Sequence, residues 1–214
     1  MKAIPREAGR VTYSKEIRAL KKISLDEAER AIIIGNILGD GCLCENWSKT
    51  NYRLIILHSI RQKEYIEWKY QMLKSWILTP PRYYLKTNSL AIRTVSHPEL
   101  SVFRSVFYKE GKKTIPSNVG EYLVNPLTLA VWFMDDGNAV KHNEETYGYH
   151  LNTQSFTKSE NEFLAGILQG MFGIKCTIQE NHRKSRIYIG SKDRRKFASL
   201  IETFVIPSMQ YKLG

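Results

Sequence analysis

The feature that most constrains the fold of this chain is an internal repeat of about a hundred residues. Asp40 closes one apolar run and Asp136 closes another, 96 residues further along, and a glycine follows each of them. The same offset takes Ser59 to Ser155, and the tripeptide Ile-Pro-Ser recurs at 115–117 and 206–208. A consistent series of matches indicates a duplicated unit rather than chance. We expect an N-terminal extension over 1–23, a first half over 24–117 and a second half over 118–214.

Each half is predicted to contain the same order of elements. Possible capping boxes open helices at Ser24 and Thr157, and Asn125 followed by Pro126 opens another. The first half reads as helices at 24–38, 62–77 and 98–108, and strands at 41–45, 52–58, 82–86 and 89–95. The second half reads as helices from 125, at 157–172 and at 192–204, and strands at 137–141, 149–155, 174–181 and 186–189. The pattern αββαββα, present twice, predicts an α+β fold with two antiparallel sheets.

Charge is the first indication of function. The 214 residues include 32 Lys and Arg against 21 Asp and Glu, which gives a net charge of +11. Such a chain attracts polyanions, and its cations are spread among tyrosines and amides rather than along one amphipathic helix. We therefore expect a nucleic acid as partner and no membrane.

Other classes are excluded by simple patterns. The longest apolar run, 31–38, is interrupted by Asn36 and is too short to cross a bilayer. Three cysteines, Cys42, Cys44 and Cys176, are too few and too scattered for a disulfide framework or a zinc site. Residues 1–24 lack the apolar core of a secretory signal. We expect an intracellular protein, in an organelle or a bacterial cytoplasm, and the sequence leaves that choice open.

Alternation along the strands predicts which side chains reach DNA. In the second half, one strand face gathers amides, basic residues and a tyrosine, which have the donors and acceptors that read base edges in a major groove. These candidates are His150, Asn152, Gln154, Lys175, Thr177, Gln179, Asn181, Arg186 and Tyr188. In the first half the candidates are the basic residues Arg53, Arg82, Lys86 and Arg93, although 52–58 is apolar on both faces and its direction stays open.

The two aspartates are the candidate catalytic residues. A carboxylate just beyond a helix C-terminus faces unpaired carbonyls and the negative end of the helix dipole, so it needs positive charge nearby. If the two helices pack side by side, the small residues Gly35, Gly39 and Ala130 permit close approach and bring Asp40 and Asp136 together. Paired carboxylates bind a hard divalent cation such as Mg²⁺, which suits metal-assisted hydrolysis of a phosphodiester. A single Asp-Gly would be read as an ordinary turn.

At these residues the chain resembles the LAGLIDADG homing endonucleases, in their single-chain form with two motifs. The resemblance rests on Ile34 to Gly41, on Leu129 to Gly137, on Lys-Lys-Thr-Ile-Pro at 112–116 and on Tyr-Lys-Leu at 211–213. It implies a pseudo-twofold monomer whose motif helices form the interface between the halves. It also implies two saddle-shaped sheets that lie in the major groove of a long, asymmetric duplex site, of which both strands are cut.

The same resemblance implies roles for individual residues. The last acid of each motif, Asp40 or Asp136, holds the catalytic Mg²⁺, with the backbone of Gly39 and Asp135 as further ligands. Mn²⁺ is expected to substitute, and Ca²⁺ to bind without cleavage. Lys113 and Lys212 are expected to stabilise charge on the scissile phosphate or to orient the attacking water.

Three alternatives remain open at this point. The chain could be a maturase that binds the encoding intron RNA, a DNA-binding relative that no longer cuts, or a transcription regulator. A regulator would need an effector or dimerisation element, and none is evident. Other nuclease signatures are incomplete: Tyr188-Ile189-Gly190 lacks a preceding Gly-Ile-Tyr, and His142-Asn143 lacks paired metal-binding histidines.

Overall fold

The structure of this chain is a computed structural model that describes residues 14–47 and 49–214. It divides into two compact units, the first ending at Val106 and the second running from Phe107 to Gly214. The predicted extension over residues 1–23 lies mostly outside the described residues, apart from the short helix α1 (Lys15–Leu20). No helix in the described part of the chain is long and apolar enough to span a bilayer.

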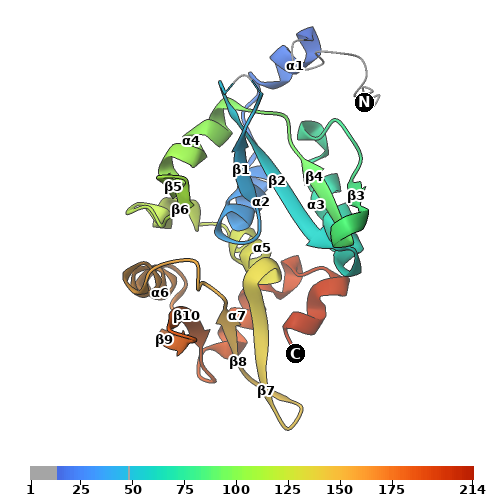
Figure 1. Cartoon of the computed structure of the whole chain (residues 1–214). Coiled ribbons are helices and arrows are strands. Elements are labelled where there is room, and N and C mark those ends of the chain that lie inside the picture. Colours follow the sequence, from blue (N-terminus) through green and yellow to red (C-terminus); the bar gives the residue numbers. More distant parts are fainter. Residues whose placement is uncertain (1–13, 48) are drawn as a thin grey trace. The chain divides into compact units, whose positions relative to one another are not determined.

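The first unit places helices on one face of an antiparallel sheet (Figure 1). Its elements are α2 (Glu27–Leu38), β1 (Cys42–Glu45), β2 (Tyr52–Ser59), α3 (Lys63–Met72), β3 (Arg82–Tyr84), β4 (Ser89–Arg93) and α4 (Pro98–Phe107). The strand order is β1-β2-β4-β3. Helix α3 packs on β2 and β4, and α2 contacts β1. The inward side chains of β2, Leu54, Ile56 and His58, are buried, so this face of the sheet forms the core.

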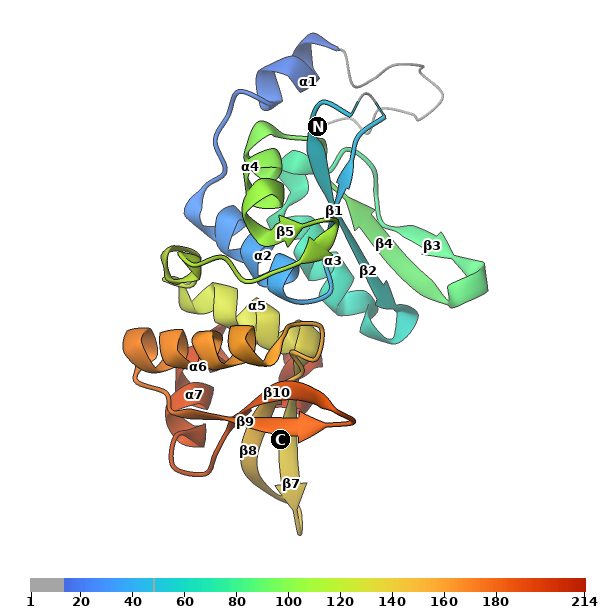
Figure 2. The same ribbon diagram turned by 60° about the vertical axis from the view of Figure 1, so that its left-hand side comes forward.

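The second unit repeats this arrangement. After the hairpin β5 (Tyr108–Lys109) and β6 (Lys112–Lys113) come α5 (Pro126–Asp136), β7 (Gly137–His142), β8 (Glu145–Leu151), α6 (Lys158–Phe172), β9 (Cys176–Asn181), β10 (Lys184–Ile189) and α7 (Arg194–Ile201). The strand order β7-β8-β10-β9 corresponds strand for strand to that of the first sheet. Figure 2 shows α6 and α7 on the same side of this sheet, where Phe197 of α7 contacts Phe133 and Tyr149.

The predicted fold class is confirmed, since αββαββα occurs twice and both sheets are antiparallel. The capping box at Thr157 is confirmed as well, as is the Asn125 cap with Pro126 in the first turn. The box predicted at Ser24 is wrong by two residues. Asp26 caps α2 and its partner is Glu29, because the aspartate carboxylate is the better acceptor for the amide of Glu29 at 2.7 Å.

The strand predicted at 149–155 is displaced in the structure, where β8 begins at Glu145 and ends at Leu151. The early start follows from a tight turn in which Asn143 and Glu144 both adopt positive φ, which joins β7 to β8 without a glycine. The early end follows from Asn161, which is fully buried and whose amide nitrogen donates to the carbonyls of Thr153 and Phe156. Asn152 and Gln154 are therefore not on a strand.

Three further elements differ from prediction in their boundaries. The helix expected at 62–77 is α-helical only over Lys63–Met72, and a 3₁₀ turn at Lys74–Trp76 follows it. The strand expected at 82–86 stops at Tyr84, so Lys86 lies in an exposed 3₁₀ turn that ends at Asn88 in the left-handed conformation. The last helix is shorter than expected, and α7 begins at Arg194 rather than Lys192.

Glu160 ties α6 to the segment that precedes α5. Its carboxylate accepts the amide of Thr157 at 2.8 Å, closing the capping box, and its second oxygen accepts the amide of Ile115 at 2.8 Å. Burial alone raises the pKa of Glu160, but these hydrogen bonds outweigh it, so the pKa lies below its ordinary value of 4.5. The ionised carboxylate therefore stabilises the folded state above that pH.

We predict that Glu160→Ala lowers the free energy of unfolding by about 1 kcal/mol at pH 7, through loss of the cap and of the Ile115 contact. The difference in unfolding free energy between the variant and the wild type should shrink as the pH falls below 4.5 and passes the lowered pKa of Glu160 in the folded state. The wild-type carboxylate is then protonated and no longer contributes its stabilisation. Urea unfolding of both proteins at pH 7 and at a pH below 4.5 measures this difference. Glu162→Ala, an exposed acid on the same helix, is the control and should change little. A difference that grows in acid would contradict this account.

Candidate active-site residues and nucleic-acid interface

Both candidate acids lie at the C-terminal end of a buried helix. Side chains from Ala31 to Leu38 are buried in α2, and those from Leu127 to Asp135 in α5. Asp40 follows α2 in a turn and leaves 44% of its side chain exposed, whereas Asp136 is the last residue of α5 and is half-buried. Each acid therefore presents carboxylate oxygens at the end of a helix whose flanks are apolar.

The glycine after each acid is required by close approach of the chain. A Cβ on Gly41 would lie 2.8 Å from the Cβ and carbonyl oxygen of Asn36, and one on Gly137 would lie 2.0 Å from the Phe133 ring. In both units the chain passes directly over the last turn of its helix, and the amides of Gly41 and Gly137 donate to carbonyls of that turn. The repeated Asp-Gly thus fixes where each carboxylate leaves its helix.

In the second unit, cationic and amide groups saturate the end of α5. The ammonium of Lys212 donates to the carbonyl oxygens of Met134 at 2.6 Å and Asp135 at 2.7 Å. The carbonyl of Asp136 accepts both the backbone and side-chain amides of Asn152, at 2.9 and 2.8 Å. Lys212 thereby supplies the positive charge that the end of this helix requires. It also occupies one acceptor site of the Asp135 carbonyl, which had been expected as a metal ligand.

In the first unit, the end of α2 is supported differently. His58 on β2 is buried, and its Nδ1 lies 3.6 Å from Oδ2 of Asp40. Behind it, the buried ammonium of Lys69 on α3 contacts Nε2 of His58 at 2.9 Å and donates to Oδ1 of Asn36 at 2.7 Å. Sequence reasoning did not find this cluster. The available signals were Asn36 within an apolar run and a lysine at helical spacing from Tyr65.

The donor set at both ends fits a divalent cation. Carboxylate oxygens at the negative ends of two helices are hard ligands of the kind that Mg²⁺ and Ca²⁺ prefer. Asp40 and Asp136 would supply these ligands, one from each unit. The ligand roles of Gly39 and Asp135, and the helix-contact roles of the buried residues Gly35, Gly39 and Ala130, stay predictions.

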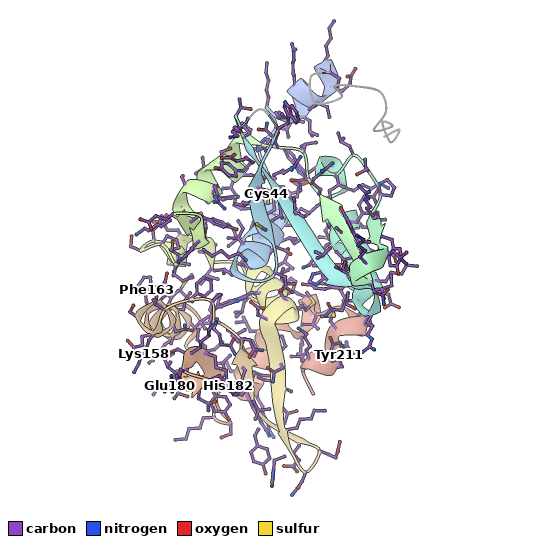
Figure 3. The ribbon with its side chains drawn as sticks, viewed as in Figure 1. Cys44, Lys158, Phe163, Glu180, His182 and Tyr211 are labelled. Carbon is purple, nitrogen blue, oxygen red and sulfur yellow. The ribbon has the colours of Figure 1, made fainter. Side chains whose placement is uncertain are left out.

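The outward face of the second sheet is polar, as the sequence predicted. Pairing aligns His150 with Tyr188, Tyr188 with Thr177, and Arg186 with Gln179, so these five side chains share one face. Opposite them, Ile187 and Ile189 are fully buried. Lys175 is exposed just before β9, Glu180 is exposed near the end of β9, and His182 is exposed in the turn to β10 (Figure 3). The side chain of Asn181 lies outside the described ones.

Three of the predicted contact residues are engaged within the unit. His150 is buried and its Nε2 lies 2.8 Å from Oε1 of Gln179. Burial lowers the pKa of His150, against the opposing effect of the Gln179 contact, so the ring is neutral near pH 7. The side-chain amide of Asn152 bonds to the Asp136 carbonyl and to Asn138. Asn152 is thus placed beside an acid rather than on the sheet face.

The structure settles the direction of the first sheet, which the sequence left open. Ile55, Leu57 and Ala91 lie on its outward face with the Cys42 and Cys44 side chains (Cys44 is marked in Figure 3). Arg53, Arg82 and Arg93 share that face in register with them. A hollow of about 460 Å³ adjoins it, lined by Ile55, Ala91, Arg82, Arg93 and the Pro80–Tyr84 segment. The face is therefore apolar at its centre and cationic around it.

Comparison with known proteins identifies the family. Residues 30–197 match the family model described as the LAGLIDADG DNA endonuclease family. This chain belongs to that family. The match spans both buried helices with their terminal acids and both sheets, so the duplicated architecture described above is the LAGLIDADG architecture.

Two curated relatives and one solved structure document the similarity. The chain is 32% identical to "Probable intron-encoded endonuclease 1" of Wickerhamomyces canadensis, over 94% of this chain and 90% of that protein. It is 38% identical to "Intron-encoded endonuclease ai4" of Dictyostelium discoideum, over 51% of this chain and 67% of that protein. The solved structure of the homing endonuclease I-WcaI bound to its DNA recognition sequence aligns with a TM-score of 0.85 at 30% identity, covering 97% of this chain and 96% of that one.

We predict that Lys212→Met destabilises the second unit, because two carbonyls at the end of α5 lose their ammonium partner. The expected loss is about 1–3 kcal/mol in the free energy of unfolding, measured in urea. Lys196→Met is the matched control: Lys196 also bonds a carbonyl at a helix end, that of Gly173 at 3.0 Å, but it is exposed. Equal effects of the two substitutions would show that burial at α5 is unimportant.

Proposed function

We propose that this chain is a site-specific double-strand DNA endonuclease that acts in the homing of the intron or intein that encodes it. The observation that carries the proposal is the repeated acid: each unit places one carboxylate, Asp40 or Asp136, at the end of a buried LAGLIDADG helix. The net charge of +11 and the cationic sheet faces support a polyanionic duplex as substrate. The relatives named above as endonucleases support the same activity.

In this proposal the chain's own residues divide the work. Asp40 and Asp136 hold the divalent cation, with Mg²⁺ as the expected ion, Mn²⁺ as a substitute, and Ca²⁺ binding without cleavage. When bound, such a cation makes water a nucleophile near neutral pH and neutralises charge on the leaving oxygen. Lys212 holds the last turn of α5 and so fixes the direction of Asp136. Lys113, half-buried on β6, is proposed to contribute positive charge near the phosphate.

The chain is further proposed to act as a monomer, since its two units already supply the two acids. Two alternative functions remain. One is a maturase, whose partner would be the encoding intron RNA, and the other is a DNA-binding protein that does not cleave. Competition between the duplex target and the structured intron RNA separates these readings, because a maturase should prefer the RNA. We propose that the protein works inside the compartment that contains its target DNA.

The first prediction is that Asp40→Asn and Asp136→Asn each reduce cleavage about a thousandfold or more and leave binding nearly unchanged, because the sheets rather than the acids supply the affinity. The experiment selects binders from a randomised duplex library in Ca²⁺ and then adds Mg²⁺. Glu162→Gln, an exposed acid on α6, is the control and should cleave normally. Specific binding without cleavage by the wild type would move the function to a binding module. The absence of specific binding would refute the DNA substrate.

The second prediction concerns how each half of the target is read. The apolar centre of the first sheet, where Leu57 is 47% exposed, suits contact with thymine methyl groups, whereas Thr177, Gln179 and Arg186 of the second sheet suit hydrogen bonds to base edges. Replacing thymine by deoxyuridine removes only the methyl group. We expect affinity to fall about fourfold per contacted methyl in the half-site under the first unit, and to change little in the other half.

Crosslinking from the exposed Leu85 position assigns each half-site to its unit. In Leu57→Asn, replacing thymine by deoxyuridine at the positions that residue 57 contacts should no longer lower the affinity. Equal losses in both half-sites, or a penalty that persists in Leu57→Asn, would count against the division of readout between the two sheets.

A further inference from the structure

Behind Asp40, four side chains of the first unit form a continuous polar chain through an apolar core. Lys69 is fully buried, and its ammonium donates to Oδ1 of Asn36 at 2.7 Å and lies 2.9 Å from Nε2 of His58. The ammonium also lies 4.1 Å from the centre of the Tyr65 ring, within cation–π range. On the far side of the imidazole, Nδ1 faces Oδ2 of Asp40 at 3.6 Å.

The arrangement of donors fixes the state of the imidazole. The side-chain nitrogen of Asn36 donates to the Ile32 carbonyl at 2.8 Å, so its oxygen is directed to Lys69. An ammonium has three donors and no acceptor, and burial of its charge is tolerated only where acceptors surround it. Asn36, Tyr65 and His58 supply that environment, which makes Nε2 of His58 an acceptor without a proton. With Nε2 accepting from Lys69, the ring's N–H is Nδ1–H, on the side that faces Asp40.

We propose that His58 is a positioning residue for Asp40, set in its tautomer by Lys69 and Asn36. At 3.6 Å the contact is longer than a hydrogen bond. It therefore acts through the N–H dipole, which favours one orientation of the Asp40 carboxylate. Partners of this kind that orient a metal-binding carboxylate commonly change metal affinity or activity by 10- to 100-fold. This inference rests on the proposed endonuclease function.

Among the described residues, this arrangement of Asn36, Lys69 and His58 is present in the first unit alone. The 96-residue offset takes Asn36 and Lys69 to Trp132 and Ala165, and alanine has no donor to offer. Asp136 is instead supported by Asn152 and Lys212. Since the two acids are held by different groups, a change at His58 should affect one of the two strand cuts more than the other.

The first measurement is spectroscopic and needs no metal. Long-range ¹H–¹⁵N spectra of the full chain labelled at histidine report which ring nitrogen carries the proton. We expect His58 to be the Nδ1–H tautomer in the wild type, and Lys69→Met to admit the Nε2–H tautomer because the ammonium that requires an acceptor is gone. A wild-type ring protonated on Nε2 would overturn the inference. If Lys69→Met does not fold, the wild-type spectrum alone still decides this point.

The second measurement follows a supercoiled plasmid with one target site through its nicked and linear forms in Mg²⁺. His58→Phe removes both ring nitrogens, and His58→Gln replaces chiefly the one that faces Lys69. We expect both to slow one cut about tenfold more than the other, so that nicked circles accumulate. His58→Asn, whose amide lies near the Nδ1 position, should restore most of the rate. Affinity for the duplex in Ca²⁺ should change less than about twofold.

His97→Phe is the matched control, since His97 is a buried histidine of the same unit that receives the Glu99 amide. It should leave the ratio of the two cuts unchanged. Equal rates of both cuts in His58→Phe, or an equal imbalance in His97→Phe, would overturn the positioning role while leaving the proposed function intact. Failure of the wild type to cut at all would instead remove the proposed function.

Discussion

A carboxylate placed at the C-terminal end of a buried helix faces that helix's unpaired carbonyl oxygens and the negative end of its dipole, and both disfavour its charge. This chain imposes that situation twice, at Asp40 and Asp136, and much of the surrounding structure compensates for it. In the second unit the ammonium of Lys212 binds the last carbonyls directly. In the first, the imidazole of His58 faces the carboxylate itself. Carboxylate oxygens at such a position are hard ligands of the kind that a divalent cation prefers.

The two units therefore share a backbone plan and differ in chemistry. Their sheets have the same strand order, and each helix ends in the same Asp-Gly with no room for a side chain at the glycine. On that common frame one outward face is apolar with arginines around it, and the other is polar, with Thr177, Gln179 and Arg186. A duplicated scaffold with unlike faces suits an asymmetric duplex, because each half of the target meets a different set of contacts.

Much of the fold could be predicted from the sequence because its signals are local. The apolar runs that end in Asp-Gly, the capping box at Thr157 and the proline after Asn125 each depend on neighbouring residues, and each was confirmed. Boundaries failed where a distant or unusual group decided them. The end of β8 is set by buried Asn161, and its start by a turn in which Asn143 and Glu144 take positive φ without a glycine.

The sequence by itself determined the duplication and the α+β class, and it indicated the two candidate acids and a polyanionic partner, because periodicity, composition and Asp-Gly spacing are properties of the chain alone. Only the tertiary structure decided which face of β2 is buried, since its side chains are apolar on both sides. The tertiary structure also revealed that Lys69, which looks like a surface cation, is fully buried between Asn36 and His58. Whether a side chain is buried depends on elements that are distant in the sequence and packed together in the fold. A lysine that would be solvated at the surface is thereby placed where it contacts Asn36 and His58 directly.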